Sequence, residues 1–144
     1  MQKILLDYTF LEALIFEKNE KHEIADQLAK VIKKEDYLYI PSNVLTIMMK
    51  KLENYNSESI KFVNNIRYST RIDCSIDKNL YMDAYAFFEE NPSLNYTDCL
   101  TIEYMKKKGL QYILSFNENF DKIKGIKRLY RLDTQYHQQL NYFN

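Results

Sequence analysis

Hydrophobic residues follow two different spacings along the chain, and the two spacings alternate. Short extended runs rich in Ile, Leu and Tyr predict strands. We expect these strands at Lys3–Leu6, Tyr37–Ile40, Ile72–Ile76, Gln111–Ser115 and Lys127–Leu132. Between these runs, apolar residues recur every three or four positions, which predicts amphipathic helices. We expect the helices at 9–15, 22–34, 42–52, 57–66, 77–91 and 97–109.

Residues with known preferences for helix ends support several of these boundaries. Ser42, Asp77 and Thr97 each stand where a side-chain oxygen can cap the first turn of a helix. Gly109 predicts a left-handed end to the last long helix, because glycine adopts positive φ without steric cost. The helix that begins at Asp77 is expected to bury an apolar face made of Leu80, Met82, Tyr85, Ala86 and Phe87.

The alternating order of strands and helices determines the predicted fold class. Parallel strands connected by helices form a sheet that is covered by helices on both faces. We therefore predict an α/β protein, a three-layer α/β/α sandwich with a central parallel sheet. No internal repeat or linker divides the 144 residues. We expect one domain at residues 1–132 and a polar, aromatic tail at residues 133–144.

Composition excludes several kinds of site and compartment. The two glycines, Gly109 and Gly125, lie too far apart for the glycine-rich loops that bind nucleotide phosphates. The two cysteines and two histidines do not have the spacing of a zinc site, so a bound metal would take mainly oxygen ligands. No apolar run approaches the ~18 residues that a membrane span requires, and no secretory signal is visible. We expect a cytoplasmic protein with no membrane segment.

Charge is balanced overall but uneven along the chain. Twenty Lys and Arg residues offset twenty Asp and Glu residues, which argues against non-specific binding to nucleic acid through net charge. Residues 101–131, however, hold eight Lys or Arg and three acids, so this region could face an anion. Alternatively, Lys106, Lys107 and Lys108 complement the dipole at the end of a helix and the other charges solvate the surface.

Polar residues that follow the predicted strands are the candidates for chemistry. In an open parallel sheet, ligands bind beyond the carboxyl ends of the strands. Asp7 follows the first strand, Asp98 begins a helix, and Asn117 and Asn119 follow the strand that ends at Ser115. Two close carboxylates favour a hard cation such as Mg²⁺. The alternative is that Asp7 and Asp98 only cap the first turns of their own helices.

Four segments in this order resemble a known family. The segments read ILLDYTFL at 4–11, IPSNVLT at 40–46, SLNYTDCL at 93–100 and ILSFNENF at 113–120. Together they are similar to the consecutive blocks of a PIN domain, and more narrowly to those of VapC-type toxin ribonucleases. The resemblance reaches from the N-terminus to about Leu132.

This resemblance implies a fold, a reaction and partners. It implies a parallel sheet flanked by helices, with an acidic cluster that binds Mg²⁺ or Mn²⁺. The implied reaction is the attack of water on an RNA phosphodiester, assisted by the metal. Members of the toxin branch usually form homodimers and are held inactive by a small antitoxin protein. The first and third family acids correspond to Asp7 and Asp98, with Asn117 and Asn119 as further candidate metal ligands.

The departures from the family pattern leave two hypotheses for the function. The second family acid, a glutamate, is replaced by Ile47, and the fourth acidic region holds the amides Asn117 and Asn119. An amide offers an oxygen but no charge. The chain is therefore either a metal-dependent endoribonuclease of the toxin type, with full or reduced activity, or an inactive PIN-fold module that binds RNA or a protein partner.

Two other acids are candidates to replace the missing carboxylates. Glu103 lies on the same helix as Asp98, and Glu118 lies within the fourth block. On an ideal helix Glu103 points away from Asp98, and Glu118 is expected to face solvent.

Overall fold

Five parallel strands form the centre of the molecule. The structure is a computed structural model, and it describes residues 2–33 and 36–132. The strands are β1 (Lys3–Leu6), β2 (Tyr37–Tyr39), β3 (Ile72–Asp73), β4 (Tyr112–Leu114) and β5 (Lys127–Leu129), in the spatial order β3-β2-β1-β4-β5. β1 pairs in parallel with β2 on one side and β4 on the other. The carboxyl ends of all the strands therefore meet at one edge of the sheet.

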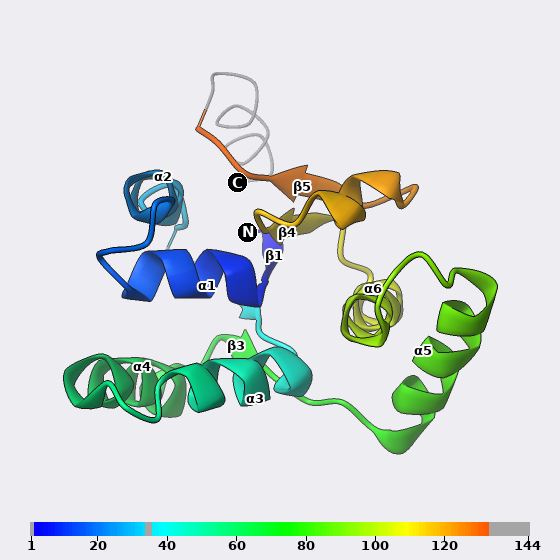
Figure 1. The fold of residues 1–144 in the computed structure, drawn as a ribbon, viewed down its shortest axis with the longest axis horizontal. Helices are drawn as coiled ribbons and strands as arrows, with labels where there is room; N and C mark the ends of the chain where they lie inside the picture. Colours follow the sequence, from blue (N-terminus) through cyan, green and yellow to red (C-terminus); the bar gives the residue numbers. More distant parts are fainter. Residues whose placement is uncertain (1, 34–35, 133–144) are drawn as a thin grey trace.

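Helices cover both faces of this sheet. The helices of the described residues are α1 (Tyr8–Ile15), α2 (His22–Ala29), α3 (Ser42–Lys51), α4 (Asn56–Tyr68), α5 (Lys78–Glu90), α6 (Tyr96–Lys108) and the 3-10 helix η1 (Glu118–Lys122). Helices α1 to α4 lie on one side of the sheet and α5 and α6 on the other (Figure 1). None of these helices has the length and hydropathy needed to cross a bilayer. The arrangement confirms the predicted three-layer α/β/α fold.

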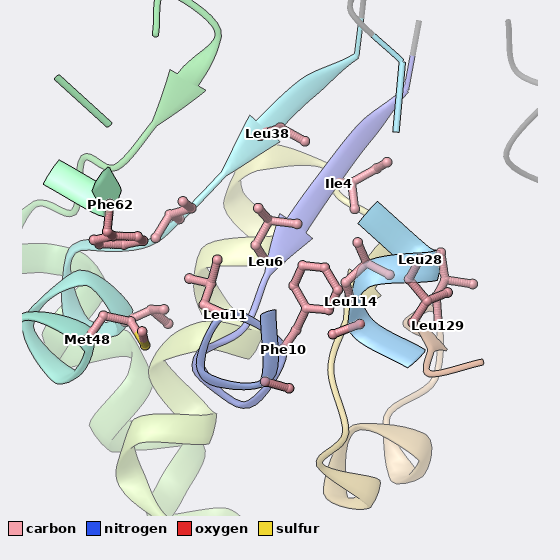
Figure 2. Close-up of a cluster of buried hydrophobic side chains, with 14 of the residues drawn as sticks. Ile4, Leu6, Phe10, Leu11, Leu28, Leu38, Met48, Phe62, Leu114 and Leu129 are labelled. Carbon is pink, nitrogen blue, oxygen red and sulfur yellow. The ribbon is translucent and has the colours of Figure 1, made fainter. Parts of the chain in front are cut away.

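The side chains of β1 alternate between two hydrophobic cores. Ile4 and Leu6 pack into the core under α1 to α4, whereas Leu5 packs into the core under α5 and α6. Figure 2 shows Ile4 and Leu6 in the first core, together with Phe10 of α1 and Leu114 of β4. Burial of each such side chain contributes roughly 1.5–3 kcal/mol. This alternation determines which face of the sheet each residue of β1 occupies. It therefore also determines how the residues that follow β1 are placed at the carboxyl edge of the sheet.

Several predicted helix ends differ from the observed ones. The caps of α3 and α6 are Pro41 and Asn95, not Ser42 and Thr97, and the Asn95 side chain accepts a hydrogen bond from the Asp98 N–H. Helix α2 ends at Ala29, several residues before the predicted end. Asp77 does cap α5, because its side chain accepts a hydrogen bond from the Leu80 N–H. Asn95 and Thr97 are separated by one residue, and both residue types cap helices, so the sequence alone does not distinguish them.

The predicted apolar face of α5 is partly wrong. Leu80 and Ala84 are the buried residues of this helix, whereas Met82 and Tyr85 are exposed over more than half of their surface. Periodicity alone could not separate the two faces, because apolar residues occur on both sides of α5. The predicted tail at residues 133–144 lies outside the described residues, as do residues 34 and 35 at the predicted end of α2.

We predict that Gly109→Ala lowers the free energy of unfolding by about 1 kcal/mol. Gly109 ends α6 with a φ of 68°, in the left-handed region, as predicted from the sequence. A Cβ at this position would meet no atom within 4 Å, so the whole cost comes from the backbone conformation. Urea unfolding monitored by circular dichroism measures the change. Gly109→Asn should cost less, because asparagine tolerates this conformation, and equal stability of the alanine variant and the wild type would contradict the prediction.

Candidate active site

Two buried carboxylates meet at the carboxyl edge of the sheet. Asp7 directly follows β1, and Asp98 lies in the first turn of α6; each is 2% exposed. Asn117 connects them, because its Nδ2 donates to Asp98 and its backbone N–H donates to Ser115 Oγ, which in turn donates to Asp7. Neither carboxylate forms an ion pair within the described part of the chain. The structure thus brings together the two acids that the sequence singled out.

Neither acid caps its own helix through its side chain. Asp7 occupies the N-cap position of α1, but its side chain makes no capping hydrogen bond there. The first turn of α6 is capped by Asn95, which leaves the carboxylate of Asp98 available to other groups. The capping alternative raised from the sequence is therefore not how these side chains are used.

Two hydroxyl groups hold the carboxylate of Asp7. Ser115 Oγ donates to Asp7 Oδ2 at 2.6 Å, and Thr9 Oγ1 donates to the same oxygen at 2.8 Å. These hydroxyls also organise the chain after β4, since Thr9 Oγ1 accepts from the Phe116 N–H and Ser115 Oγ accepts from the Asn117 N–H, both at 3.0 Å. The carboxylate thus has a fixed orientation.

Burial raises the pKa of Asp7 above its ordinary value of 3.8. Loss of hydration is the main cause, and the nearby charge of Asp98 acts in the same direction. The hydrogen bonds from Ser115 and Thr9 oppose this rise, because they stabilise the ionised form. Desolvation has the larger effect, so ionisation of Asp7 lowers the free energy of unfolding.

Two side-chain amides hold the carboxylate of Asp98. Asn117 Nδ2 donates to Asp98 Oδ2 at 3.0 Å, and Asn119 Nδ2 donates to the same oxygen at 3.4 Å. The orientation of the Asn117 amide is fixed from its other end, because Asn117 Oδ1 accepts from the Asn119 N–H at 3.0 Å and so caps η1. Asn117 therefore turns its nitrogen, not its oxygen, toward Asp98.

An arginine anchors the segment that carries these amides. Arg128 of β5 is buried, donates to both carboxylate oxygens of Asp121 at 2.9 and 2.8 Å, and donates to the Ser115 carbonyl at 3.3 Å. This bidentate pair connects the end of η1 to β5, and the third hydrogen bond connects both to the end of β4. The positions of Ser115 and Asn117 consequently depend on Arg128.

A family model for the PIN domain matches residues 4–126. The chain belongs to the PIN domain family. A comparison with curated proteins found no significant match.

Solved PIN-fold toxins share the architecture of this PIN domain. VapC20 of Mycobacterium tuberculosis, described as a sarcin–ricin loop cleaving toxin, is 20% identical with a TM-score of 0.72, and the match covers 82% of this chain and 92% of that one. A toxin–antitoxin complex from Klebsiella pneumoniae is 14% identical with a TM-score of 0.67, covering 90% and 99% of the two chains. VapBC2 from Rickettsia felis, bound to a promoter DNA fragment, is 14% identical with a TM-score of 0.64, covering 89% and 98%.

The acids considered as replacements do not join the crevice of this PIN domain. Glu103 pairs with Lys106 at 3.2 Å, and Glu118 is exposed at the start of η1. Ile47 of α3 is half-buried and offers no ligand atom. Within the described residues, no group of three or more His, Cys, Asp or Glu side chains is placed to hold a metal. Among the described residues, the crevice therefore has two carboxylates and no third.

The donor set still fits one hard divalent cation. Magnesium is commonly held by one or two carboxylates, with waters and substrate phosphates as its other ligands. Asp7 and Asp98 supply two buried carboxylates, and no basic side chain among residues 2–33 and 36–132 pairs with either of them. Asn117 does not fit the role of ligand in the observed orientation, because its Oδ1 caps η1. Asp7 and Asp98 would hold the metal, and the two amides would orient the carboxylate of Asp98 through their hydrogen bonds to it.

Three further polar residues of the site were not identified as functional from the sequence. Thr9 and Ser115 hold Asp7, and Asn43 of α3 donates from Nδ2 to Thr101 of α6 at 3.5 Å while its Oδ1 is buried without a hydrogen-bond partner. All three belong to the segments that carry the family resemblance. A signal was therefore present, because each is a polar residue within four positions of the end of a strand.

The lysines at the end of α6 are engaged in ion pairs. Lys106 pairs with Glu103 at 3.2 Å, Lys107 with Asp77 at 2.5 Å and Lys108 with Asp73 at 3.4 Å. These exposed pairs contribute little stability individually. These ion pairs favour the interpretation that Lys106, Lys107 and Lys108 serve the end of α6 and the protein surface, and not the interpretation that they form an anion-binding site.

We predict that Asn117→Asp tightens the binding of Mn²⁺ roughly tenfold, because affinity for hard cations rises with the charge and number of oxygen ligands. The substitution replaces a donor to Asp98 with a third negative charge. Isothermal titration in metal-free buffer measures the affinity. Asn64→Asp, a matched change on the exposed surface of α4, should leave it unchanged. Equal affinities for Asn117→Asp and the wild type would contradict the role given to this amide.

We predict that Asp7→Asn raises the melting temperature at pH 7 in EDTA. A carboxyl whose folded-state pKa is raised destabilises the fold once it ionises, so stability falls as pH rises from 3.8 through the higher pKa of folded Asp7. The variant removes this loss. Its advantage should therefore shrink as pH falls toward 3.8 and disappear below it, as measured by circular dichroism melts across this range. An advantage that is independent of pH, or that equals the effect of Asp83→Asn on the exposed surface of α5, would argue against this cause.

Proposed function

We propose that this protein is a toxin-type endoribonuclease that hydrolyses RNA phosphodiester bonds with a divalent cation, Mg²⁺ or Mn²⁺, at Asp7 and Asp98. The observation that carries the proposal is the pair of buried, unpaired carboxylates at the carboxyl edge of the sheet. The family membership and the toxin structures that share the fold support it.

Each residue of the crevice has a defined task in this proposal. A bound cation would polarise the phosphate and lower the pKa of an attacking water. Asp7 supplies a charged oxygen whose direction is set by Ser115 and Thr9. Asp98 supplies the second charge, and Asn117 fixes its carboxylate from the side of η1. Because these contacts already exist, little reorganisation is required when substrate arrives.

The proposed partners follow from the structures that share the fold. One of those structures is a toxin–antitoxin complex, and another contains VapBC2 on promoter DNA. We propose a small antitoxin protein as the regulator of this chain, RNA as its substrate, a homodimer as its assembled form and the cytoplasm as its compartment.

A groove of about 1260 Å³ runs between α1 and α4. None of the four candidate site residues, Asp7, Asp98, Asn117 and Asn119, lines this groove.

A second function is favoured by specific residues of the crevice. Ile47 and Asn117 stand where the family pattern has acids, and the amides of Asn117 and Asn119 already satisfy Asp98 with hydrogen bonds. A crevice of this kind can persist without a cation. The second candidate is therefore a PIN-fold module that has lost cleavage and binds RNA or a protein partner.

We predict that Asp7→Asn and Asp98→Asn each reduce Mn²⁺-dependent cleavage at least ~100-fold, a loss of ~2.7 kcal/mol of transition-state stabilisation. Labelled single-stranded RNAs and a hairpin with the sarcin–ricin sequence are suitable substrates for gel-based cleavage assays. Glu118→Gln, an exposed acid near the crevice, is the matched control and should retain activity.

The same assays separate the two functions. Cleavage that survives in both aspartate variants would exclude this crevice as the active site. An absence of cleavage by the wild type, together with RNA binding that persists in EDTA, would favour the non-cleaving module. Binding that requires a divalent metal would count against that second function.

A further inference from the structure

Asn43, in the first turn of α3, carries an oxygen atom that the fold leaves unsatisfied. The side chain is half-buried, and its Oδ1 is fully buried without a hydrogen-bond partner. It is the one buried side-chain oxygen in this situation among residues 2–33 and 36–132. The large majority of buried polar atoms in proteins have a partner, so an exception requires a specific explanation, such as a bound ion.

The order of the strands places Asn43 at the same edge of the sheet as the crevice. Strands β2, β1 and β4 are neighbours in the parallel sheet, so their carboxyl ends lie side by side. Asp7 directly follows β1, Asn43 lies four residues after β2, and Asn117 lies three residues after β4. Each of the three strands thus leads to one polar side chain where ligands of a parallel sheet bind.

A hydrogen bond connects Asn43 to the helix that carries Asp98. Asn43 Nδ2 donates to Thr101 Oγ1 at 3.5 Å, and Thr101 is buried in α6. Thr101 lies three positions after Asp98, so the two side chains are neighbours on one face of α6, with about 5–6 Å between their Cβ atoms. Asn43 therefore approaches this face of α6 from α3, whereas Asn117 reaches Asp98 from the N-terminus of η1.

Asn43 also shares a helix face with the position where the family pattern has its second acid. Asn43 and Ile47 are four positions apart in α3, so their side chains project from the same side of the helix. Ile47 has no ligand atom, whereas Asn43 has an amide oxygen. The oxygen that α3 lacks at Ile47 is therefore available one turn earlier in the same helix.

We propose that Asn43 Oδ1 is the third protein oxygen of the cation site, beside the carboxylates of Asp7 and Asp98. The inference rests on the proposed function, because it assumes a divalent cation in this crevice. Amide carbonyl oxygens suit hard cations such as Mg²⁺ and Mn²⁺. A neutral third oxygen adds a ligand without the repulsion of a third buried charge.

The two asparagines nearest to Asp98 have opposite roles in this arrangement. Asn117 uses its oxygen to cap η1 and turns its nitrogen toward Asp98. Asn43 uses its nitrogen for Thr101, which leaves its oxygen for another group. Asn117 therefore orients a ligand, whereas Asn43 is itself one.

Titration of Mn²⁺ into the metal-free full chain tests this assignment without RNA. Asn43→Leu keeps a side chain of similar length but removes the oxygen, so it should weaken Mn²⁺ binding roughly tenfold. Asn43→Asp supplies a charged oxygen in the same place and should tighten binding roughly tenfold. The same two changes at Asn64, on the exposed surface of α4, should leave the affinity unchanged. Isothermal titration measures the affinity, and circular dichroism confirms that each variant is folded.

A second substitution separates the loss of a ligand from a disturbance of α3. In the Asn43→Leu background, Ile47→Glu places a carboxylate on the same face one turn later, and it should return the Mn²⁺ affinity at least to the wild-type value. A purely structural role of Asn43 would not be compensated in this way, because the glutamate does not replace the hydrogen bond to Thr101. A folded double variant that still binds weakly would therefore contradict the assignment.

The outcomes distinguish this inference from the proposed function. Unchanged affinity in folded Asn43→Leu, together with binding lost in Asp7→Asn, would exclude Asn43 as a ligand and leave the site of two carboxylates. A wild type that binds no Mn²⁺ would overturn both the cation site and this inference. The expected responses at Asn43, in a protein that cleaves no RNA, would support this inference and count against the endoribonuclease.

Discussion

The hydrogen bond from Ser115 Oγ to Asp7 Oδ2 joins the end of the central strand β1 to the end of its neighbour β4, and the crevice is arranged around it. It depends on the parallel register that pairs Leu6 with Leu114. A slip of one residue in β1 would exchange Leu5 and Leu6 between the two cores and turn Asp7 away from Ser115. The buried carboxylate of Asp7 therefore reaches its hydrogen-bond partners only when both hydrophobic cores are correctly packed. The orientation of the site and the packing of the sheet are in this sense a single constraint.

The sequence predicted most of the fold because its strongest signals are local. The apolar run of β1, the left-handed end at Gly109 and the cap at Asp77 each follow from a few adjacent residues. The convergence of Asp7 and Asp98 also followed, because the carboxyl ends of parallel strands meet at one edge. The exposed face of α5 did not follow, since Met82 and Leu80 are equally apolar in sequence and only packing on α6 distinguishes them.

The details of the crevice could not be predicted because they depend on atoms rather than residue types. Asn117 has a donor and an acceptor, and the sequence does not say which of them faces Asp98. The hydrogen bond from the Asn119 N–H to Asn117 Oδ1 decides this, and it requires η1 to be in place. Arg128 in turn ties η1 to the end of β4 through Asp121 and the Ser115 carbonyl. The character of the site is thus determined by contacts between segments that are separate in the sequence.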